Sequence, residues 1–165
     1  MWKTRVMRDL EQLRKEGFRV RSDKGEEEIS DLRCFVVNMI GPKDSPYEGF
    51  EYDIRFTITE QFPFKSPSVG FVQRVLHPNV DEGSGSICLD SLNKAWSPAF
   101  SLVNIVGTQL PYLLQYPNPN DPFNREAAAL LARDPEGFRR TVKAHCARHA
   151  RALPKPAEPE ASQTK

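Results

Sequence analysis

Apolar residues recur at helical spacing at the start of the chain and at alternate positions further along. The first pattern predicts a helix from about residue 3 to residue 16, with one apolar face and basic residues on its other faces. The apolar face consists of Trp2, Val6, Leu10 and Leu13. Gly17 is the expected stop of this helix.

The segment from residue 50 to residue 58 alternates apolar and polar residues, which is typical of a strand with one buried face. Its apolar positions are Tyr52, Ile54, Phe56 and Ile58. Three other runs, 18–21, 32–40 and 69–72, also predict strands, and proline and glycine punctuate the later gaps. We therefore expect an antiparallel meander of four strands that is entered by one helix.

No sustained helical or strand period runs from His77 to Phe100, so this segment is expected to be irregular. Ordered loops of this length are usually functional. A second helix is predicted after Ser101, ending before Tyr116, and Pro111 should kink or shorten it. Its apolar positions are Leu102, Ile105, Val106, Leu110 and Leu113.

Two further helices are predicted near the end of the chain, at 125–133 and 135–152. Asp134 is a good N-cap for the second of them, and Pro135 suits its first turn. The last stretch, residues 153–165, is rich in proline, and from Pro154 on it contains no large apolar residue, so it is expected to be a disordered tail. Residues 1–152 are then the folded domain.

Composition narrows the class of protein. A chain of 165 residues with 39% apolar and 27% charged residues suits one soluble domain with a single core. The net charge of +1 gives no reason to expect a nucleic-acid or membrane partner, and no apolar run is long enough to span a bilayer. With no apolar leader and three cysteines without CxxC spacing, a reducing cytoplasmic or nuclear location is expected.

Candidate chemistry gathers around the tripeptide His77-Pro78-Asn79, which precedes Cys88 by nine residues counted from the asparagine. A cysteine thiol is a strong nucleophile at neutral pH, and an asparagine amide can donate a hydrogen bond to an oxyanion. Pro78 fixes one backbone angle between His77 and Asn79. These are the parts that acyl transfer through a thioester needs.

Several motifs in order, from about Met1 to about Ala152, resemble the ubiquitin-conjugating enzyme family. Besides the tripeptide and Cys88 they are Gly41-Pro42, Ser45-Pro46-Tyr47-Glu48-Gly49, Phe62-Pro63-Phe64-Lys65-Ser66-Pro67, Trp96-Ser97-Pro98 and Pro117-Asn118-Pro119. The resemblance implies an α+β fold, with the four-stranded meander, an N-terminal helix and about three C-terminal helices. It also implies a Phe62–Pro63 cis peptide bond. The nine-residue step looks most like the histone-ubiquitinating subgroup when it is taken together with Asp81-Glu82, Tyr116-Pro117-Asn118-Pro119 and Glu126-Ala127-Ala128-Ala129. That subgroup tends to have a longer, acidic tail, and the short proline-rich tail here departs from it.

The implied reaction passes ubiquitin from the activating enzyme to Cys88, and then to a substrate lysine with a RING-type ligase. No cofactor is expected on this chain, because ATP is used by the activating enzyme. By resemblance, Asn79 supports the oxyanion or its loop, Asp121 assists the lysine, and His77 braces the loop through backbone hydrogen bonds. Pro78, Asp90 and Asn118 are expected to support the site, although Asp90 could equally cap a turn.

The resemblance also implies a ligase-binding surface, which overlaps the surface for the activating enzyme. Its expected members are Arg5, Arg8, Phe64, Ser97, Pro98 and Ala99. Phe64 stands on a proline-rich turn, where an exposed ring can anchor an interface. A core position for Phe64 is the alternative, and Trp96 beside the loop can equally be a plug at the edge of the core.

Other interpretations compete with this one. Cys34 and Cys146 are expected to be small buried hydrophobes, whereas Cys88 follows a polar, glycine-rich loop where burial is not expected. A Cys-His protease, with His77 as the base, is disfavoured. His145 and His149 have a metal-binding spacing, but too few ligands accompany them, so no metal is expected. A conjugating enzyme for another modifier such as SUMO stays open, as does a non-catalytic ubiquitin-binding scaffold, which would lack the cysteine.

Overall fold

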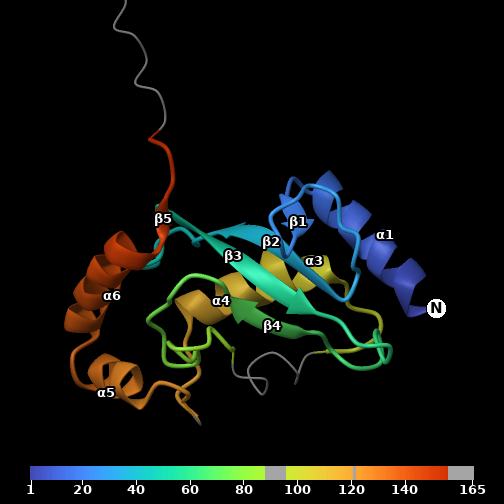
Figure 1. The fold of residues 1–165 in the computed structure, drawn as a ribbon. Coiled ribbons are helices and arrows are strands. Elements are labelled where there is room, and N and C mark those ends of the chain that lie inside the picture. Colours follow the sequence, from blue (N-terminus) through green and yellow to red (C-terminus); the bar gives the residue numbers. More distant parts are fainter. Residues whose placement is uncertain (88–95, 121, 156–165) are drawn as a thin grey trace, which may run out of the picture.

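The computed structural model describes residues 1–87, 96–120 and 122–155. An antiparallel sheet at its centre is built in chain order from β1 (Val20–Ser22), β2 (Cys34–Ile40), β3 (Phe50–Thr57) and β4 (Ser68–Phe71). Figure 1 shows the N-terminal helix at one end of this sheet and the last two helices at the other. The predicted α+β class and four-stranded meander are confirmed.

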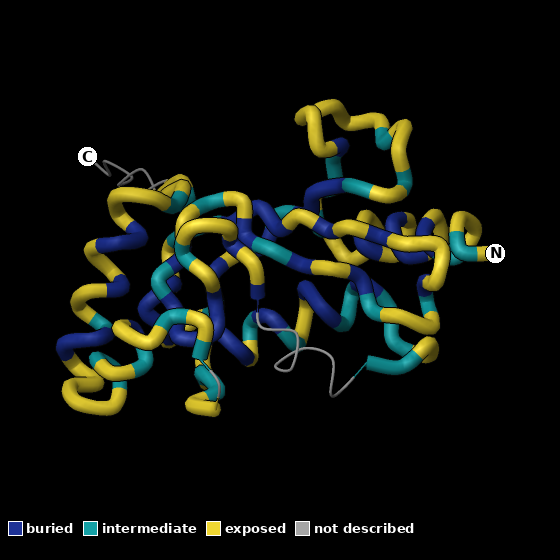
Figure 2. Tube along the Cα trace, turned by 60° about the horizontal axis from the view of Figure 1, so that its bottom comes forward, coloured by how far each residue is buried: buried dark blue, intermediate teal, exposed yellow. Residues whose placement is uncertain are grey.

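The register explains why one face of the sheet is apolar. Phe35 of β2 lies opposite Phe56 of β3, with the two rings stacked at 5.5 Å, and Val37 lies opposite Ile54. Side chains of successive strand residues point to opposite faces, so these four share the inner face. The buried residues of the strands and of the helices form one hydrophobic core cluster. Figure 2 colours the buried stretches dark blue.

Helix α1 (Trp2–Lys15) covers the start of the sheet and buries Val6, Leu10 and Leu13 completely or nearly so. The predicted helix is confirmed within one residue at each end. Gly17 follows with a φ of 90°, a left-handed conformation that favours glycine and ends the helix.

The second predicted helix is continuous but not uniform, as α3 (Leu102–Asn104), a π-helical turn η1 (Ile105–Gln109) and α4 (Leu110–Gln115) follow one another. In η1 the N–H of Leu110 donates to the carbonyl of Ile105, five residues back. Pro111 was expected to kink or shorten this helix, and instead a wider turn precedes it. The wider turn lies where the proline ring would otherwise meet the carbonyl of residue i−4.

Helix α5 (Arg125–Arg133) has the predicted bounds, and the Asn124 side chain caps it by accepting from the N–H of Ala127. Helix α6 (Pro135–His149) begins as predicted, with the Asp134 side chain accepting from the N–H of Gly137 at 3.0 Å.

The predicted end of α6 at residue 152 is wrong, because the backbone becomes extended at Ala150. Arg151–Ala152 form β5 and pair with the first two residues of β3, beyond the end of β4. The Arg151 guanidinium then contacts Glu51 at 2.7 Å and Asp53 at 3.0 Å on the outer face of the sheet. These ion pairs favour the strand pairing over another helical turn.

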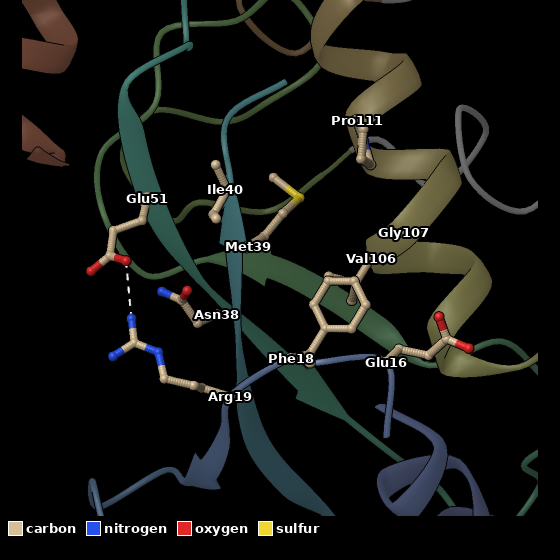
Figure 3. Close-up of a pocket in the computed structure, with 11 residues that line it drawn as sticks. Glu16, Phe18, Arg19, Asn38, Met39, Ile40, Glu51, Val106, Gly107 and Pro111 are labelled. Atoms are coloured by element: carbon tan, nitrogen blue, oxygen red, sulfur yellow. Dashed lines mark hydrogen bonds and ion pairs between the residues drawn. The ribbon is translucent and has the colours of Figure 1, made fainter. Parts of the chain in front are cut away.

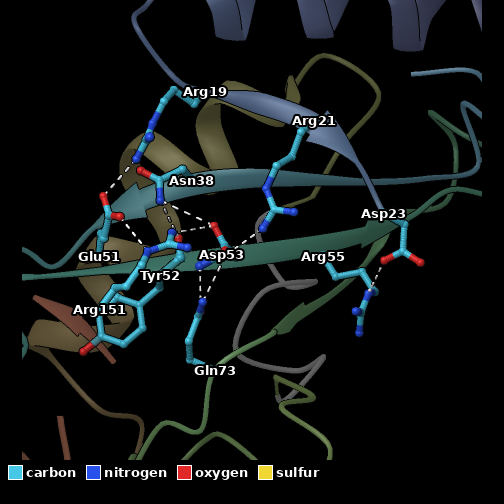
Figure 4. A network of polar contacts seen from close by, with 10 residues as sticks. All are labelled: Arg19, Arg21, Asp23, Asn38, Glu51, Tyr52, Asp53, Arg55, Gln73 and Arg151. Atoms are coloured by element: carbon cyan, nitrogen blue, oxygen red, sulfur yellow. Dashed lines mark hydrogen bonds and ion pairs between the residues drawn. The ribbon is translucent and has the colours of Figure 1, made fainter. Parts of the chain in front are cut away.

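The outer face of the sheet is polar and holds the nearly buried carboxylate of Asp53 (Figure 4). Asp53 accepts hydrogen bonds from Arg21 at 2.8 Å, from Gln73 at 3.0 Å and from Arg151. Burial raises the pKa of Asp53, but the hydrogen bonds from Gln73 and Arg151 and the charge of Arg21 outweigh it and hold the pKa below its ordinary value. The Asp53 carboxylate therefore stays ionised beside Arg21 and Arg151.

Beside this network lies a hollow of ≈ 460 Å³ between the turn after α1, strand β2 and turn η1 (Figure 3). Phe18, Met39 and Val106 line it, and the Arg19–Glu51 ion pair stands at its rim. Asn79, the predicted catalytic residue that the described ranges include, does not line this hollow. Within the described ranges, no helix is long and apolar enough to cross a membrane.

Candidate active site

The turn His77–Asn79 is held from inside the protein. His77 is fully buried, its Nδ1 accepts from the backbone N–H of Asn79 at 2.9 Å, and its Nε2 donates to the carbonyl of Leu113 at 2.8 Å. Burial lowers the pKa of His77 to about 4, although the hydrogen bond to Leu113 acts in the opposite direction. The imidazole is therefore neutral at physiological pH, and both of its nitrogens are occupied. This leaves no free nitrogen to deprotonate a thiol.

Asn79 makes a two-point contact with the backbone of Asn118. Its side-chain Nδ2 donates to the Asn118 carbonyl at 2.8 Å, and its Oδ1 accepts from the Asn118 N–H at 2.8 Å. Asn79 is fully buried, so solvent does not compete for these bonds. A third link joins the same segments, because the N–H of Asn124 donates to the carbonyl of Pro78 at 3.0 Å. The two predicted asparagines thus lie together, although 39 residues separate them.

The loop after Asn79 folds back along the edge of β4. The N–H of Asp81 donates to Ser86, the N–H of Gly85 donates to Asp81, and Val80 forms a bridge with Ile87. Gly85 has a φ of 77°, and a Cβ atom there would lie 2.0 Å from the carbonyl oxygen of Phe71. Only glycine fits this approach.

Ile87 is buried and directly precedes Cys88 in the sequence. Cys88 and Asp90 lie outside the described residues, as does Asp121. The structure describes the segments that precede them in the sequence: the turn with Asn79, the loop up to Ile87 that leads to Cys88, and the segment with Asn118 that leads to Asp121.

The other two cysteines lie in settings that disfavour a reactive thiolate. Cys34 is half-buried in β2, and burial together with the charge of Asp23 raises the pKa of its thiol. Cys146 is buried on α6, 3.2 Å from the Tyr52 hydroxyl, and burial raises its thiol pKa as well. Since the thiolate is the nucleophile, neither residue is suited to carry an acyl group.

Arg5 reaches from α1 to the loop predicted to meet a ligase. Its guanidinium donates to the carbonyls of Pro98 at 2.8 Å and Phe100 at 2.6 Å, and it pairs with Asp9 at 3.2 Å. The other oxygen of Asp9 accepts from the N–H of Leu102 at the start of α3. Arg5 therefore braces this loop, whereas Arg8 is exposed.

Asp9 was missed by the sequence reasoning. The available signal was an acidic residue between Val6 and Leu10 on the apolar face of the first helix. Such a residue needs a buried partner, because an unpaired charge is costly to bury.

The proline-rich turn with Phe64 lies against the same loop. The Phe62–Pro63 peptide bond is cis, as predicted, and Phe62 is buried beside Trp96 with ring centroids 5.8 Å apart. The Trp96 Nε1 donates to the carbonyl of Pro63 at 2.9 Å, so Trp96 both plugs the core edge and ties the two loops together. Phe64 itself is 80% exposed, which makes the alternative core position wrong. Ser97, Pro98 and Ala99 are all at least partly exposed beside it.

His145 and His149 lie on one side of α6 with ring centroids 4.4 Å apart. Across the described ranges, no group of three or more histidine, cysteine or acidic side chains is arranged to hold a metal ion.

Comparison with known proteins decides the family. The sequence pattern of the family described as ubiquitin-conjugating enzyme matches residues 5–146. The chain belongs to this family. The relatives it resembles include ubiquitin-conjugating enzyme E2 5 of Arabidopsis thaliana, which is 52% identical over 131 residues, covering 79% of this chain and 71% of the relative. The 24 kDa ubiquitin-conjugating enzyme of Saccharomyces cerevisiae is 44% identical over 119 residues, covering 72% of this chain and 55% of the relative.

The family relationship extends to solved structures. A putative ubiquitin-conjugating enzyme from Plasmodium yoelii superposes with a TM-score of 0.79 at 26% identity, covering 92% of this chain and 97% of that chain. Another sequence relative is the 23 kDa ubiquitin-conjugating enzyme of Triticum aestivum, which is 53% identical over 117 residues, covering 71% of this chain and 64% of the relative. The matched region thus covers between 55% and 71% of the length of the three sequence relatives named here.

Proposed function

We propose that this chain carries ubiquitin as a thioester on Cys88 and transfers it to the amine of a substrate lysine. The observation that carries the proposal is the pair of 2.8 Å hydrogen bonds between Asn79 and the Asn118 backbone, at the start of the loop that leads to Cys88. Family membership supports the reaction class, and the two hydrogen bonds hold the Asn79 amide in place nine residues before Cys88 in the sequence.

The first acyl transfer loads the enzyme. The Cys88 thiolate attacks the carbonyl carbon of the ubiquitin thioester on the activating enzyme, and the thiolate of that enzyme leaves. ATP is consumed upstream, so this step needs no cofactor on the chain. Loading exchanges one thioester for another and therefore has little thermodynamic cost.

The second transfer forms the isopeptide bond. A neutral lysine amine attacks the Cys88 thioester, negative charge develops on the carbonyl oxygen, and the Cys88 thiolate leaves. Asn79 supports that oxyanion or the loop around it, as a positioned amide donor stabilises charge that develops in the transition state. Asp121 orients the amine and accepts its proton, and Pro78, Asn118 and Asp90 support the site, with His77 held neutral beneath it.

The partners follow from the same chemistry. The partners are ubiquitin, its activating enzyme, a RING-type ligase and protein substrates with accessible lysines. The proposed reaction needs neither a nucleic acid nor a membrane. The ligase-binding surface is Arg8, Phe64, Ser97, Pro98 and Ala99, with Arg5 holding its loop in shape. A cytoplasmic or nuclear location fits these partners.

Two alternatives to this function are conjugation of another modifier and a non-catalytic scaffold, and one loading assay distinguishes them. Relatives named as ubiquitin-conjugating enzymes favour ubiquitin over another modifier such as SUMO, and the presence of Cys88 disfavours a non-catalytic scaffold. The resemblance to the histone-ubiquitinating subgroup stays a prediction.

The test is a loading reaction with ATP and either ubiquitin or SUMO, each supplied with the activating enzyme for that modifier, and run on a non-reducing gel. We expect a thiol-sensitive ubiquitin adduct that Cys88→Ala abolishes, whereas Cys34→Ala and Cys146→Ala retain it. Retention of the adduct in Cys88→Ala would refute the assignment of the nucleophile. Loading with SUMO and not with ubiquitin would refute the modifier.

A further inference from the structure

Glu82 and His145 form a contact that the proposed reaction does not use. The Nε2 of His145 on α6 lies 3.0 Å from Oε1 of Glu82, which stands at the tip of the loop between Asn79 and Cys88. The two residues are 63 positions apart in the chain, so only the tertiary fold brings them together. We call this contact the Glu82–His145 clasp.

The burial of the two partners differs. The His145 side chain is only 7% exposed, on the same helix face as Phe138, Val142 and Cys146, whereas the Glu82 side chain is 40% exposed. Within the part of the chain that the structure describes, the buried Nδ1 of His145 has no hydrogen-bond partner. A buried nitrogen without a partner is unfavourable, and an apolar residue would fill this place without that cost. The contact with Glu82 is what the imidazole provides here and an apolar residue would not.

The clasp completes the anchoring of a loop that is already held elsewhere. Its base is closed by the Val80–Ile87 bridge, and its side is fixed by the hydrogen bond from the Phe71 N–H to the Gly85 carbonyl at 2.9 Å. The Glu82 side chain holds the tip to α6. That helix is in turn tied to the sheet, through the contact of Cys146 with Tyr52 and through β5.

We propose that His145, acting through Glu82, is a positioning residue for the thioester. The clasp holds still the loop whose two ends carry Asn79 and Cys88, and so keeps the amide and the thioester carbonyl aligned for attack. This inference rests on the proposed function of those two residues. Misalignment by a fraction of an ångström slows a step that depends on orientation, and discharge to an amine is such a step.

The kinetic test uses four variants and a control. His145→Phe and Glu82→Ala each remove the clasp, and their combination tests whether they act as a pair. His145→Gln keeps an N–H near the place of Nε2. Gly83→Ala is the matched control in the same loop, because a Cβ there meets only a side-chain oxygen of Asp81 at 3.9 Å.

We expect His145→Phe and Glu82→Ala each to slow single-turnover discharge to free lysine by roughly three- to tenfold, the range one hydrogen bond supports. Loading should change less than about twofold, and the double variant should be no slower than the slower single variant. His145→Gln should discharge at a rate within about twofold of the unchanged protein. Gly83→Ala should discharge at the same rate as the unchanged protein. Multiplied effects in the double variant, or no rescue by glutamine, would overturn the pairing.

A second measurement does not depend on activity. Amide hydrogen exchange in His145→Phe should speed up at Asp81 and Gly85, whose N–H groups are hydrogen-bonded within the loop, while the melting temperature stays within about 2 °C. Unchanged exchange would overturn the clasp even if Cys88 proves to be the nucleophile. Conversely, faster exchange in a protein that never forms a thioester would retain the clasp and refute the proposed function. A large drop in melting temperature with equal losses of loading and discharge would make His145 merely structural.

Discussion

Replacing Asn79 by alanine separates a structural role from a chemical one, because the structure predicts a cost for each. The change deletes both hydrogen bonds to the Asn118 backbone, each 2.8 Å long and shielded from solvent by a fully buried side chain. At about 0.5–1.5 kcal/mol for each bond, the free energy of unfolding should fall by about 1–3 kcal/mol. For a chain of this size, that corresponds to a melting temperature lower by roughly 2–12 °C.

The chemical cost is expected to be larger. An asparagine amide has two N–H groups, and one of them donates to Asn118. If the other one stabilises the oxyanion during discharge, its loss should raise the barrier by roughly 2.7–4 kcal/mol, or about 10²–10³-fold in rate. Loading should fall much less, because the thiolate attacking an activated thioester depends less on that donor.

The assay is single-turnover discharge of the purified thioester to free lysine, with loading rates and thermal melting measured on the same samples. Asn124→Ala is the matched control, since it removes the cap of α5 and about 1 kcal/mol of stability without touching the Asn79–Asn118 contact. Discharge by Asn79→Ala within about threefold of this control would refute the oxyanion role. An unchanged melting temperature would refute the structural role.

Three further outcomes are expected. Phe64→Ala should leave the melting temperature and ligase-free discharge nearly unchanged, because the ring is 80% exposed, yet abolish stimulation by a RING ligase; a large drop in melting temperature would contradict this. The pKa of His77 falls from 6.5 to about 4 on folding, so between these two pH values the unfolded chain binds a proton that the folded chain does not. Up to about 3 kcal/mol of stability should therefore be lost as the pH falls from 6.5 to about 4. Denaturant titrations of His77→Gln should show a shallower dependence on pH, and an equal slope would contradict the assignment. Gly85→Ala should lose about 1–3 kcal/mol by the same titration, because its Cβ would collide with the Phe71 carbonyl; stability equal to that of Gly83→Ala would rule this out.

Strand β3 was predictable because its apolar residues alternate with polar ones. Tyr52, Ile54 and Phe56 all point into the core, and the observed strand ends one residue from the predicted end. β5 was not predictable in this way. It has two residues and no apolar alternation, and it depends on Arg151 meeting Glu51, 100 residues earlier in the chain.

In the candidate site too, some residues could be predicted from the sequence, whereas their contacts could not. The sequence predicted that Asn79 and Asn118 belong to one site, but their two-point contact depends on tertiary geometry. Arg5 was predicted, by resemblance, to belong to the ligase-binding surface. The structure gives it three partners within the protein, namely Asp9 and the carbonyls of Pro98 and Phe100. Helical spacing alone paired His145 with His149, whereas the nearest polar partner of His145 is Glu82, on another segment.

The short pairing of β5 with β3 has a consequence for how the protein behaves in concentrated solution. An uncovered sheet margin presents unpaired N–H and C=O groups, which recruit the margin of another molecule and lead to aggregation. Beyond the end of β4, the backbone of Phe50 and Glu51 would be such a margin, and β5 covers it, with the Leu153 N–H donating to Gly49 just after it. Shortening the chain at the end of α6 would thus remove a guard against self-association, and it would also leave Asp53 without one of its cations.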